Sequence, residues 1–356
     1  MTSLILLGAG KIGETITQLL HACGDYSVSV ADHDEARLAP VAALGARTVR
    51  AEFGDPQALR QLIRGHEIVI SACPFHLTPL IASAAVAEGA HYFDLTEDIA
   101  STRSVKALAA NATVALVPQC GLAPGFISIL AYAMTRKLDS LRDVHMRVGA
   151  LPVYPTNALK YNLTWSTDGL INEYCNPCEA IIDGERRETL ALEEIEAFSL
   201  DGITYEAFNT SGGLGTLCDT LEGRVENLNY KTVRYPGHRD IVKVLIRDLR
   251  LGQRRALLKD VLEASVPMTT QDVVLVFVTV SGMRNGRLTQ ESFAKKIYSA
   301  TLGERLFSAI QITTAAGVCA MVDLHREGGL PSRGFVRQED ADLERFLANR
   351  FGRYYA

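Results

Sequence analysis

SLILLGAGKIGETITQLLHACGDYSVSVAD, residues 3–32, joins an apolar run, a glycine-rich turn, an amphipathic segment and a second apolar run. This order predicts a strand, a turn, a helix and another strand. Gly8, Gly10 and Gly13 have the GxGxxG spacing, in which the first glycine permits a tight turn and the second lets backbone approach a pyrophosphate. The third lets helix and strand pack closely. We therefore predict a dinucleotide site here, the alternative being a structural glycine turn.

Two further features of this stretch suit a dinucleotide. Lys11 and Ile12 begin the predicted helix, whose unpaired N–H groups and partial positive charge favour a phosphate. Asp32 follows the glycines by about twenty residues, where a carboxylate accepts hydrogen bonds from the adenosine ribose hydroxyls. A carboxylate there would repel a 2′-phosphate, so we expect NAD, with NADP less favoured; Arg37 weakens that preference.

Composition excludes several classes of protein. The chain has 356 residues, 47% of them hydrophobic, and a net charge of −5, so it carries no overall positive charge for nucleic acid or an anionic membrane. No apolar run approaches the ~18 residues of a membrane span, and the first apolar run is needed as a strand rather than a signal peptide. Seven scattered cysteines are typical of a reducing cytoplasm. Cys175 and Cys178 form a single CxxC, which favours a loop over a zinc or redox site, and we expect no metal.

The first third of the chain alternates strands and helices, which predicts an α/β Rossmann domain with a doubly wound parallel sheet over residues 1–122. Strands are expected at 46–53, 66–73, 91–96 and 113–118, and helices at 34–44, 56–64, 78–88 and 101–110. Ligands bind such sheets outside the carboxyl ends of the strands. The loops after Ser71, Asp94 and Val117 therefore matter most.

Residues 123–302 are expected to form an α+β domain, used for substrate binding and oligomerisation, on a mostly antiparallel sheet. The pattern predicts a helix at 126–136, a strand at 143–152, an acidic helix at 192–197, and hairpins at Asp183–Gly184 and Asn285–Gly286. The second hairpin would pair 271–282 with 293–300. A buried helix at 303–327 and a closing helix at 340–351 belong to a tail, about 303–356, that we expect to pack back on the first domain.

A series of short motifs resembles the saccharopine reductase group of dehydrogenases, and within it the lysine 6-dehydrogenases. The motifs are GAGKIG at 8–13, GDP at 54–56, YFDL at 92–95, GLAPG at 121–125, VGALP at 148–152, YN at 161–162, SGG at 211–213 and YKTVRYPGH at 230–238. Saccharopine reductases tend to carry Asp where this chain has Ala123, and lysine dehydrogenases an acidic residue where it has Gln119. The resemblance implies NAD-dependent oxidation of an amine in an amino acid.

This reaction needs a group that accepts a proton. Hydride leaves the carbon next to nitrogen only when the nitrogen has a free lone pair, and a lysine ammonium has a pKa near 10.4. Asp94 is the first catalytic candidate because it ends a strand on the ligand side, although a helix or turn cap is the alternative. His238 is the second, since imidazole exchanges protons near neutral pH, and a structural histidine is the alternative. Glu97 and Asp98 are expected to be solvated charges at a helix start.

The remaining candidates bind substrate and cofactor. Lys231 and Arg234 are expected to bind the α-carboxylate, the alternative being a basic surface strand. Tyr161 and Asn162 are expected to line the pocket, with Thr210 in the NTSGGLGT segment; for the aromatic residue, packing is the alternative. The loop under the nicotinamide ribose is expected to consist of Ser71, Ala72 and Cys73. We expect the Cys73 thiol to be a small buried group rather than a nucleophile.

The resulting hypothesis is an NAD-dependent oxidoreductase acting on a C–N bond, most like lysine 6-dehydrogenase, which converts the side-chain amine of L-lysine to an aldehyde that cyclises to a piperideine carboxylate. A reductive condensation of the saccharopine or carboxynorspermidine type with NADPH is the second hypothesis. A non-catalytic NAD-binding protein is the third. We expect a cytoplasmic homo-oligomer, a dimer or larger, that has a small-molecule amino-acid substrate and no nucleic-acid or membrane partner.

Overall fold

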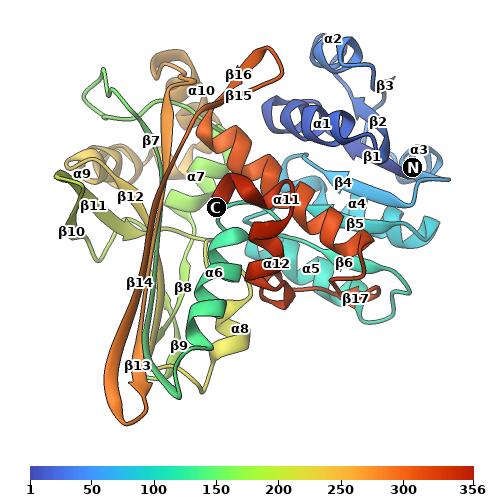
Figure 1. Cartoon of the computed structure of the whole chain (residues 1–356). Coiled ribbons are helices and arrows are strands. Elements are labelled where there is room, and N and C mark those ends of the chain that lie inside the picture. The colour runs from blue at the N-terminus through green and yellow to red at the C-terminus, as the bar shows by residue number, and fades with distance from the viewer. The chain divides into compact units, whose positions relative to one another are not determined.

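The computed structural model describes residues 1–356, which form two compact units. Unit 1 consists of Met1–Ile129 and Gln311–Ala356, and unit 2 of Leu130–Ile310. Figure 1 labels the helices and strands of both units. None of the helices has the length and apolar character needed to cross a membrane.

Unit 1 is built on a parallel sheet of seven strands. The strands are β1 (Thr2–Leu7), β2 (Tyr26–Asp32), β3 (Arg47–Arg50), β4 (Ile68–Ser71), β5 (His91–Asp94), β6 (Ala115–Val117) and β17 (Gly334–Phe335). They lie in the order β17-β6-β5-β4-β1-β2-β3, so the chain winds outward in both directions from β1. The predicted doubly wound fold is confirmed, and the switch in strand order falls between β1 and β4, where such sheets bind dinucleotides.

The helices of unit 1 begin and end close to the predicted residues. They are α1 (Lys11–Cys23), α2 (Glu35–Ala43), α3 (Pro56–Ile63), α4 (Thr78–Glu88) and α5 (Ile99–Ala109). Local signals fix their ends. Asp55 accepts hydrogen bonds from the first turn of α3, whose first residue is a proline, and Gly89 ends α4 with φ 72°. Such caps satisfy N–H and C=O groups that the helix itself leaves unpaired.

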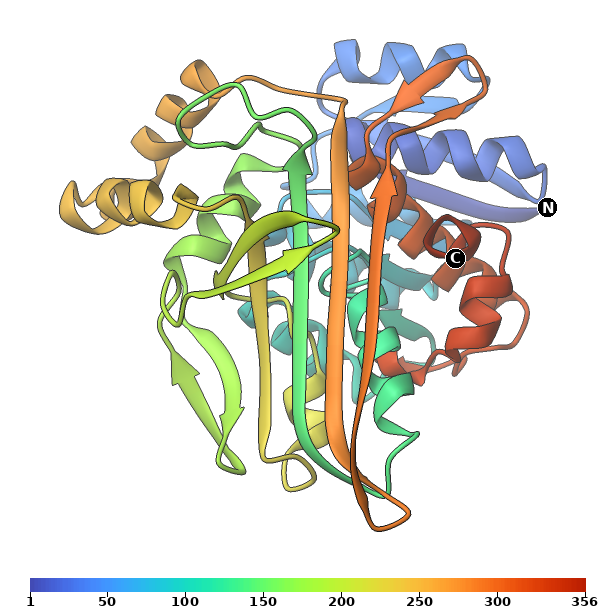
Figure 2. The same ribbon diagram turned by 60° about the vertical axis from the view of Figure 1, so that its left-hand side comes forward.

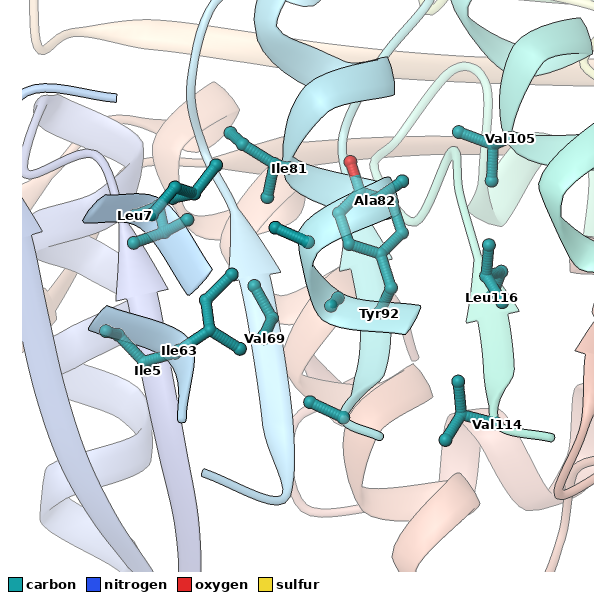
Figure 3. Close-up of a cluster of buried hydrophobic side chains, with 14 of the residues drawn as sticks. Ile5, Leu7, Ile63, Val69, Ile81, Ala82, Tyr92, Val105, Val114 and Leu116 are labelled. Atoms are coloured by element: carbon teal, nitrogen blue, oxygen red, sulfur yellow. The ribbon is translucent and has the colours of Figure 1, made fainter. Parts of the chain in front are cut away.

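One core of unit 1 lies between the sheet and helices α3, α4 and α5 (Figure 3). Its members come from alternate positions of the strands and from one stripe of each helix: Ile5, Leu7, Val69, Tyr92, Leu116, Ile63, Ile81 and Val105. Leu6 points to the opposite face, where a Cβ on Gly13 of α1 would lie 3.7 Å from its side chain. Each fully buried aliphatic side chain stabilises the fold by about 1.5–3 kcal/mol.

The C-terminal segment belongs to unit 1. It contains α11 (Ala309–Arg326), a 3₁₀ turn at Gln338–Asp340, α12 (Leu343–Ala348) and a last 3₁₀ turn at Gly352–Tyr355. The buried carboxylate of Asp323 accepts hydrogen bonds from Tyr26, Asn349 and Arg350. These contacts attach α11 and the end of the chain to β2.

Two neighbouring histidines, one on β5 and one on α11, are expected to make unit 1 less stable in acid. The rings of His91 and His325 lie 4.3 Å apart, and burial together with the neighbouring His91 lowers the pKa of His325 to about 4. An unfolded histidine titrates near 6.5, so below that pH the native state binds fewer protons than the unfolded state. Stability should therefore fall from about pH 6.5 toward pH 4, by at most about 1.4 kcal/mol per pH unit for one proton.

His325→Gln should flatten this part of the curve of unfolding free energy against pH, measured by urea unfolding. Equal slopes in wild type and variant would contradict the assignment.

Unit 2 is built on a mixed sheet in the order β10-β11-β12-β7-β13-β14, with β8 pairing β12 and β9. The strands are β7 (Ser140–Pro152), β8 (Cys178–Ile182), β9 (Glu185–Thr189), β10 (Glu196–Leu200), β11 (Ile203–Asn209), β12 (Asn227–Arg234), β13 (Asp272–Arg284) and β14 (Arg287–Tyr298). Figure 2 shows the long green β7 beside the orange β13 and β14. Only β12 and β7 pair in parallel, so the mostly antiparallel sheet is confirmed.

The helices of unit 2 lie between these strands in sequence. They are α6 (Phe126–Thr135), which begins in unit 1, α7 (Thr167–Cys175), α8 (Leu217–Leu221), α9 (His238–Lys243) and α10 (Arg255–Ser265). Both predicted hairpins occur. Asn285 and Gly286, like Asp183 and Gly184, have positive φ at both turn positions, as a two-residue type I′ turn requires.

Two predicted helix positions are wrong. Residues 192–197 do not form an acidic helix: Leu192 and Glu194 have positive φ, and Glu196 begins β10, where it pairs with Arg147. A long-range ion pair and strand pairing therefore outweigh the local helix propensity. The predicted helix at 303–327 begins later, at Ala309, because a hairpin of β15 (Ala300–Leu302) and β16 (Arg305–Phe307) precedes it.

Candidate functional site

The carboxyl ends of the central strands of unit 1 are aligned. Leu7 of β1 pairs with Ser71 of β4, and Ser71 pairs with Asp94 of β5. The loops that follow are joined, since the N–H of Ala72 donates to Leu7 O at 2.8 Å. The predicted cofactor residues and Asp94 therefore lie along one edge of one sheet.

The three glycines of the first loop have different structural roles. Gly8 has φ 102°, and a Cβ there would lie 2.8 Å from Ala72 O. A Cβ on Gly13 would lie 1.9 Å from Gly8 O. A Cβ on Gly10 would meet nothing within 4 Å, although Gly10 is the N-cap of α1. The open space at a helix N-terminus suits a pyrophosphate, while the other two glycines are required by packing. The residues present therefore fit a dinucleotide.

Asp32 connects the end of β2 to this loop. It is only 2% exposed. Its Oδ2 accepts from the N–H of Ala9 at 2.7 Å, and its Oδ1 from that of Asp34 at 2.9 Å. His33 Nδ1 lies 3.2 Å from Oδ1. Arg37 Nε lies 3.5 Å from Asp34 Oδ2. The guanidinium of Arg37 and the carboxylates of Asp32 and Asp34 therefore all lie near the predicted ribose position.

Asp32→Ala is expected to weaken NAD binding about 10- to 100-fold, the effect of losing a charge-assisted hydrogen bond of about 1.5–3 kcal/mol. The loss for NADP should be smaller, because the carboxylate no longer repels its 2′-phosphate. Comparing the two coenzymes in one variant cancels any disturbance of the Ala9 contact. Fluorescence titration measures both dissociation constants, and equal losses would remove the specificity argument.

The cysteines near this edge are poor nucleophiles. Burial and the negative charge of Asp32 raise the pKa of Cys73 to about 12. Burial also raises the pKa of Cys120. The Cys120 thiol is packed in the core, where Gln338 Nε2 donates to its sulfur at 3.3 Å. All seven cysteines are free, and no group of three metal-binding side chains is gathered anywhere in the chain.

Asp94 is a buried anchor for the loop after β6. Its Oδ1 accepts from the N–H groups of Thr96 and Gln119, at 3.0 and 2.9 Å, and its Oδ2 from Tyr92 Oη at 2.9 Å. Its backbone oxygen accepts from Cys120 N. Burial raises the pKa of Asp94 to about 6 against the effect of these donors. Of the two alternatives for Asp94, the turn cap is therefore present, and its catalytic role stays a prediction.

Glu97 differs from the solvated charge that was expected. Its side chain is only partly exposed and forms no ion pair, and its carboxylate accepts a hydrogen bond from its own backbone N–H. Burial and the nearby charges of Asp98 and Asp94 raise the pKa of Glu97 to about 7. Asp98 alone caps α5, through Ser101 N. Local sequence did not separate the two carboxylates, because their difference arises from burial by distant residues.

Arg234 of unit 2 is a buried cation with no carboxylate at ion-pair distance, although the charge of Glu173 acts on it and helps to raise its pKa. It is 2% exposed and forms no ion pair. Its Nε donates to Tyr174 Oη and its Nη1 to Val233 O, each at 2.9 Å. Its Cζ lies 4.9 Å from the ring centroid of Tyr161. A buried charge is costly unless it is paired, so this guanidinium is suited to receive an anion.

Unsatisfied polar atoms are found on Tyr161, which contacts Arg234, and on residues that follow it in the chain. Tyr161, whose ring contacts the guanidinium, has a buried hydroxyl without a hydrogen-bond partner, and so do Asn162 Oδ1 and Thr164 Oγ1. Such atoms are rare in native proteins and mark sites for water or a ligand. Thr210 Oγ1 lies 2.7 Å from Thr232 Oγ1, on the strand that carries Arg234.

Lys231 does not act with Arg234, which corrects the expected pair. Residues three apart in a strand point to opposite faces. Lys231 Nζ donates to Glu194 O at 2.7 Å and Glu196 Oε2 at 3.1 Å, and it shares Glu196 with Arg147. The motif does form a strand that carries both cations, but the alternation of side chains along a strand places them on opposite faces.

His238 does not titrate near neutral pH, which corrects the reason for its selection. Its Nδ1 lies 2.8 Å from Leu159 O and its Nε2 3.1 Å from Tyr174 Oη. Burial, with the charge of Arg234, lowers the pKa of His238 to about 3. Sequence reasoning missed Tyr174, its partner, and also Glu206, whose carboxylate accepts from the N–H groups of Gly237 and Arg239 at the start of α9.

The fold and these residues define a two-unit protein, in which a Rossmann unit fits a dinucleotide and a second unit contains an unpaired buried arginine. Residues 4–120 match the family described as saccharopine dehydrogenase NADP binding domain, and residues 121–351 the saccharopine dehydrogenase C-terminal domain. The chain belongs to the saccharopine dehydrogenase family, and the resemblance to this group is confirmed.

Known relatives agree with this assignment. The chain is 23% identical over 264 residues to saccharopine dehydrogenase [NADP(+), L-glutamate-forming] of Saccharomyces cerevisiae, covering 68% of this chain and 57% of that protein. It is 21% identical over 192 residues to the mitochondrial alpha-aminoadipic semialdehyde synthase of Bos taurus, covering 51% of this chain and 20% of that protein. The chain thus spans about half of the first relative and a fifth of the second.

A solved structure shows the same fold. The apo saccharopine dehydrogenase (L-Glu forming) of Saccharomyces cerevisiae superposes with a TM-score of 0.79 at 16% identity, covering 98% of this chain and 97% of that one.

Proposed function

We propose that this protein is a nicotinamide-dinucleotide-dependent oxidoreductase that acts on a C–N bond of an amino acid whose carboxylate binds Arg234. The observation that carries the proposal is the buried guanidinium of Arg234, which has no ion pair. The glycine loop and Asp32 of unit 1 support the coenzyme, and membership of the saccharopine dehydrogenase family supports the reaction class.

For L-lysine, the side-chain ammonium must lose a proton so that its nitrogen has a free lone pair. A bound oxidised nicotinamide would then accept the hydride from the adjacent carbon, which leaves an imine. Water adds to the resulting imine, and ammonium leaves to give the aldehyde. The bound nicotinamide ring supplies the hydride acceptor, and the protein's share is orientation and proton transfer. Asn162 Oδ1, which has no hydrogen-bond partner, can accept from the α-ammonium of the substrate.

The proton acceptor is proposed to be Glu97 rather than the buried and fully bonded Asp94. Burial raises the pKa of Glu97 to about 7, and no other side chain hydrogen-bonds to its carboxylate. The side chain lies on the loop after β5, at the ligand edge of the sheet. A general base is most effective when its pKa is near the working pH.

Glu97→Gln is expected to lower kcat about 100-fold, within the range of general acid–base catalysis. It should also remove the acidic limb of the pH profile, because the active form of Glu97 is deprotonated above about pH 7. Asp98→Asn, which keeps a side-chain oxygen to cap α5, is the control. It should keep kcat and retain the limb, moved to lower pH, because the charge of Asp98 helps to raise the pKa of Glu97. An unchanged limb in Glu97→Gln would assign the base elsewhere.

The saccharopine-type reaction is the second candidate, favoured by the name of the yeast relative. The test is a panel followed by NADH or NADPH absorbance. Turnover of L-lysine with NAD supports the first candidate. Turnover of L-saccharopine, or of NADPH with an aldehyde and L-glutamate, supports the second. Silence across the panel together with tight coenzyme binding would leave a non-catalytic dinucleotide-binding protein.

A further inference from the structure

We propose that Tyr174 and His238 form a neutral hydrogen-bonded relay that fixes the guanidinium of Arg234 for end-on binding of a carboxylate. The proposal rests on the proposed function of Arg234. Tyr174 and His238 are positioning residues in it, because they act on the substrate only through Arg234.

The direction of each hydrogen bond in the relay is determined. Leu159 O can only accept, so His238 Nδ1, 2.8 Å away, carries a hydrogen. The lone pair of the neutral ring is then on Nε2 and accepts from Tyr174 Oη at 3.1 Å. Tyr174 Oη in turn accepts from Arg234 Nε at 2.9 Å. The low pKa of His238, about 3, keeps the ring neutral at physiological pH.

The relay decides which edge of the guanidinium a substrate can reach. A carboxylate binds a guanidinium with two parallel hydrogen bonds, either through Nε and one Nη or through both Nη atoms. Tyr174 occupies Nε, and Val233 O takes one hydrogen of Nη1. Nη2 and the second hydrogen of Nη1 therefore remain for a carboxylate. The Tyr161 ring, 4.9 Å from Cζ, supports one face of the guanidinium plane.

Packing alone is the competing explanation for these aromatic groups. His238 lies 5.3 Å from Tyr161 and 6.4 Å from Phe208, between ring centroids, so it also belongs to a core. A packing role predicts that loss of the Tyr174 hydroxyl changes stability without changing affinity for a carboxylate. The relay predicts a change in affinity.

The kinetic test uses Tyr174→Phe, which keeps the ring and removes the hydroxyl. It should raise the KM for the amino acid turned over in the panel about tenfold, with kcat and the dissociation constant of NAD little changed. In an Arg234→Met background the same change should have no further effect on KM. An unchanged KM in the single variant, or an additive loss in the double variant, would overturn the relay.

His238→Phe supplies a second arm of the cycle. It should raise KM as Tyr174→Phe does, and the double variant should be no worse than either single variant, because both break one chain of hydrogen bonds. Full additivity would show two independent packing effects instead. If Arg234→Met itself leaves KM unchanged, the proposed function fails rather than the relay.

Two measurements need no substrate. Nitrogen-15 NMR of the histidine rings should find His238 as the neutral Nδ1–H tautomer between pH 6 and 9; a protonated Nε2 would overturn the relay. A crystal structure of Tyr174→Phe should show a displaced Arg234 guanidinium, and an undisplaced one would overturn it.

Discussion

Arg234→Met is expected to lower kcat/KM for the amino acid roughly 30- to 1,000-fold, because truncating one partner of a buried, hydrogen-bonded charge pair costs about 2–4 kcal/mol. The loss should appear mainly as a higher KM, since the carboxylate is bound equally in the ground and transition states. The stability of the free protein should stay equal or rise. Arg234 is 2% exposed without an ion pair, and an apolar side chain of similar length avoids the cost of burying that charge.

Steady-state kinetics and thermal unfolding of the same preparation measure both effects. Lys231→Met is the matched control, since it removes a cation from the same strand but from its other face. It should leave KM unchanged. A KM that rises in Lys231→Met and not in Arg234→Met would place the carboxylate on the opposite face of the sheet and sink the proposal.

Gly13→Ala is expected to destabilise unit 1 by about 3 kcal/mol or more, because overpacking against backbone cannot be relieved by rotating a side chain. Its Cβ would lie 1.9 Å from Gly8 O, so either α1 or the glycine loop must move. Dinucleotide binding should be lost along with stability. Urea unfolding and fluorescence titration measure the two losses.

Gly10→Ala is the control that separates binding from stability. Its Cβ meets no protein atom within 4 Å, so the thermal midpoint should be close to that of wild type. The methyl group instead occupies the space in which a pyrophosphate is predicted, so affinity for NAD should fall at least tenfold. Tight NAD binding by a stable Gly10→Ala protein would show that the phosphates lie elsewhere.

The sequence predicted unit 1 almost element by element because its signals are local. Glycine spacing, the Asp55 cap and strand–helix alternation each act within a few residues, and the parallel topology follows from the crossovers. Unit 2 was predicted less well. Glu196 lies in an acidic stretch that favours a helix, but its pairing with Arg147, far away in sequence, makes that stretch a strand.

The candidate site divides in the same way. Arg234 was selected as a candidate from its motif. Tyr174, which belongs to no recognisable motif, lies in a helix whose apolar residues have ordinary helical spacing, so the sequence did not indicate its contact with Arg234. Lys231 was grouped with Arg234 because the motif was interpreted by its charges. The two-residue period of a strand, which places the two side chains on opposite faces, was not applied. Glu97 was missed because its pKa depends on burial by distant residues.

The interrupted chain of unit 1 has a consequence for synthesis on the ribosome. Residues 130–310 form unit 2 as one continuous segment, whereas unit 1 needs both residues 1–129 and residues 311–356. Tyr355, 1% exposed, donates to Thr313 O, and Asp323 must find Tyr26 of β2. All residues of unit 2 are therefore synthesised before the last residues of unit 1. Until α11 has been synthesised, part of the surface of the amino-terminal sheet stays uncovered.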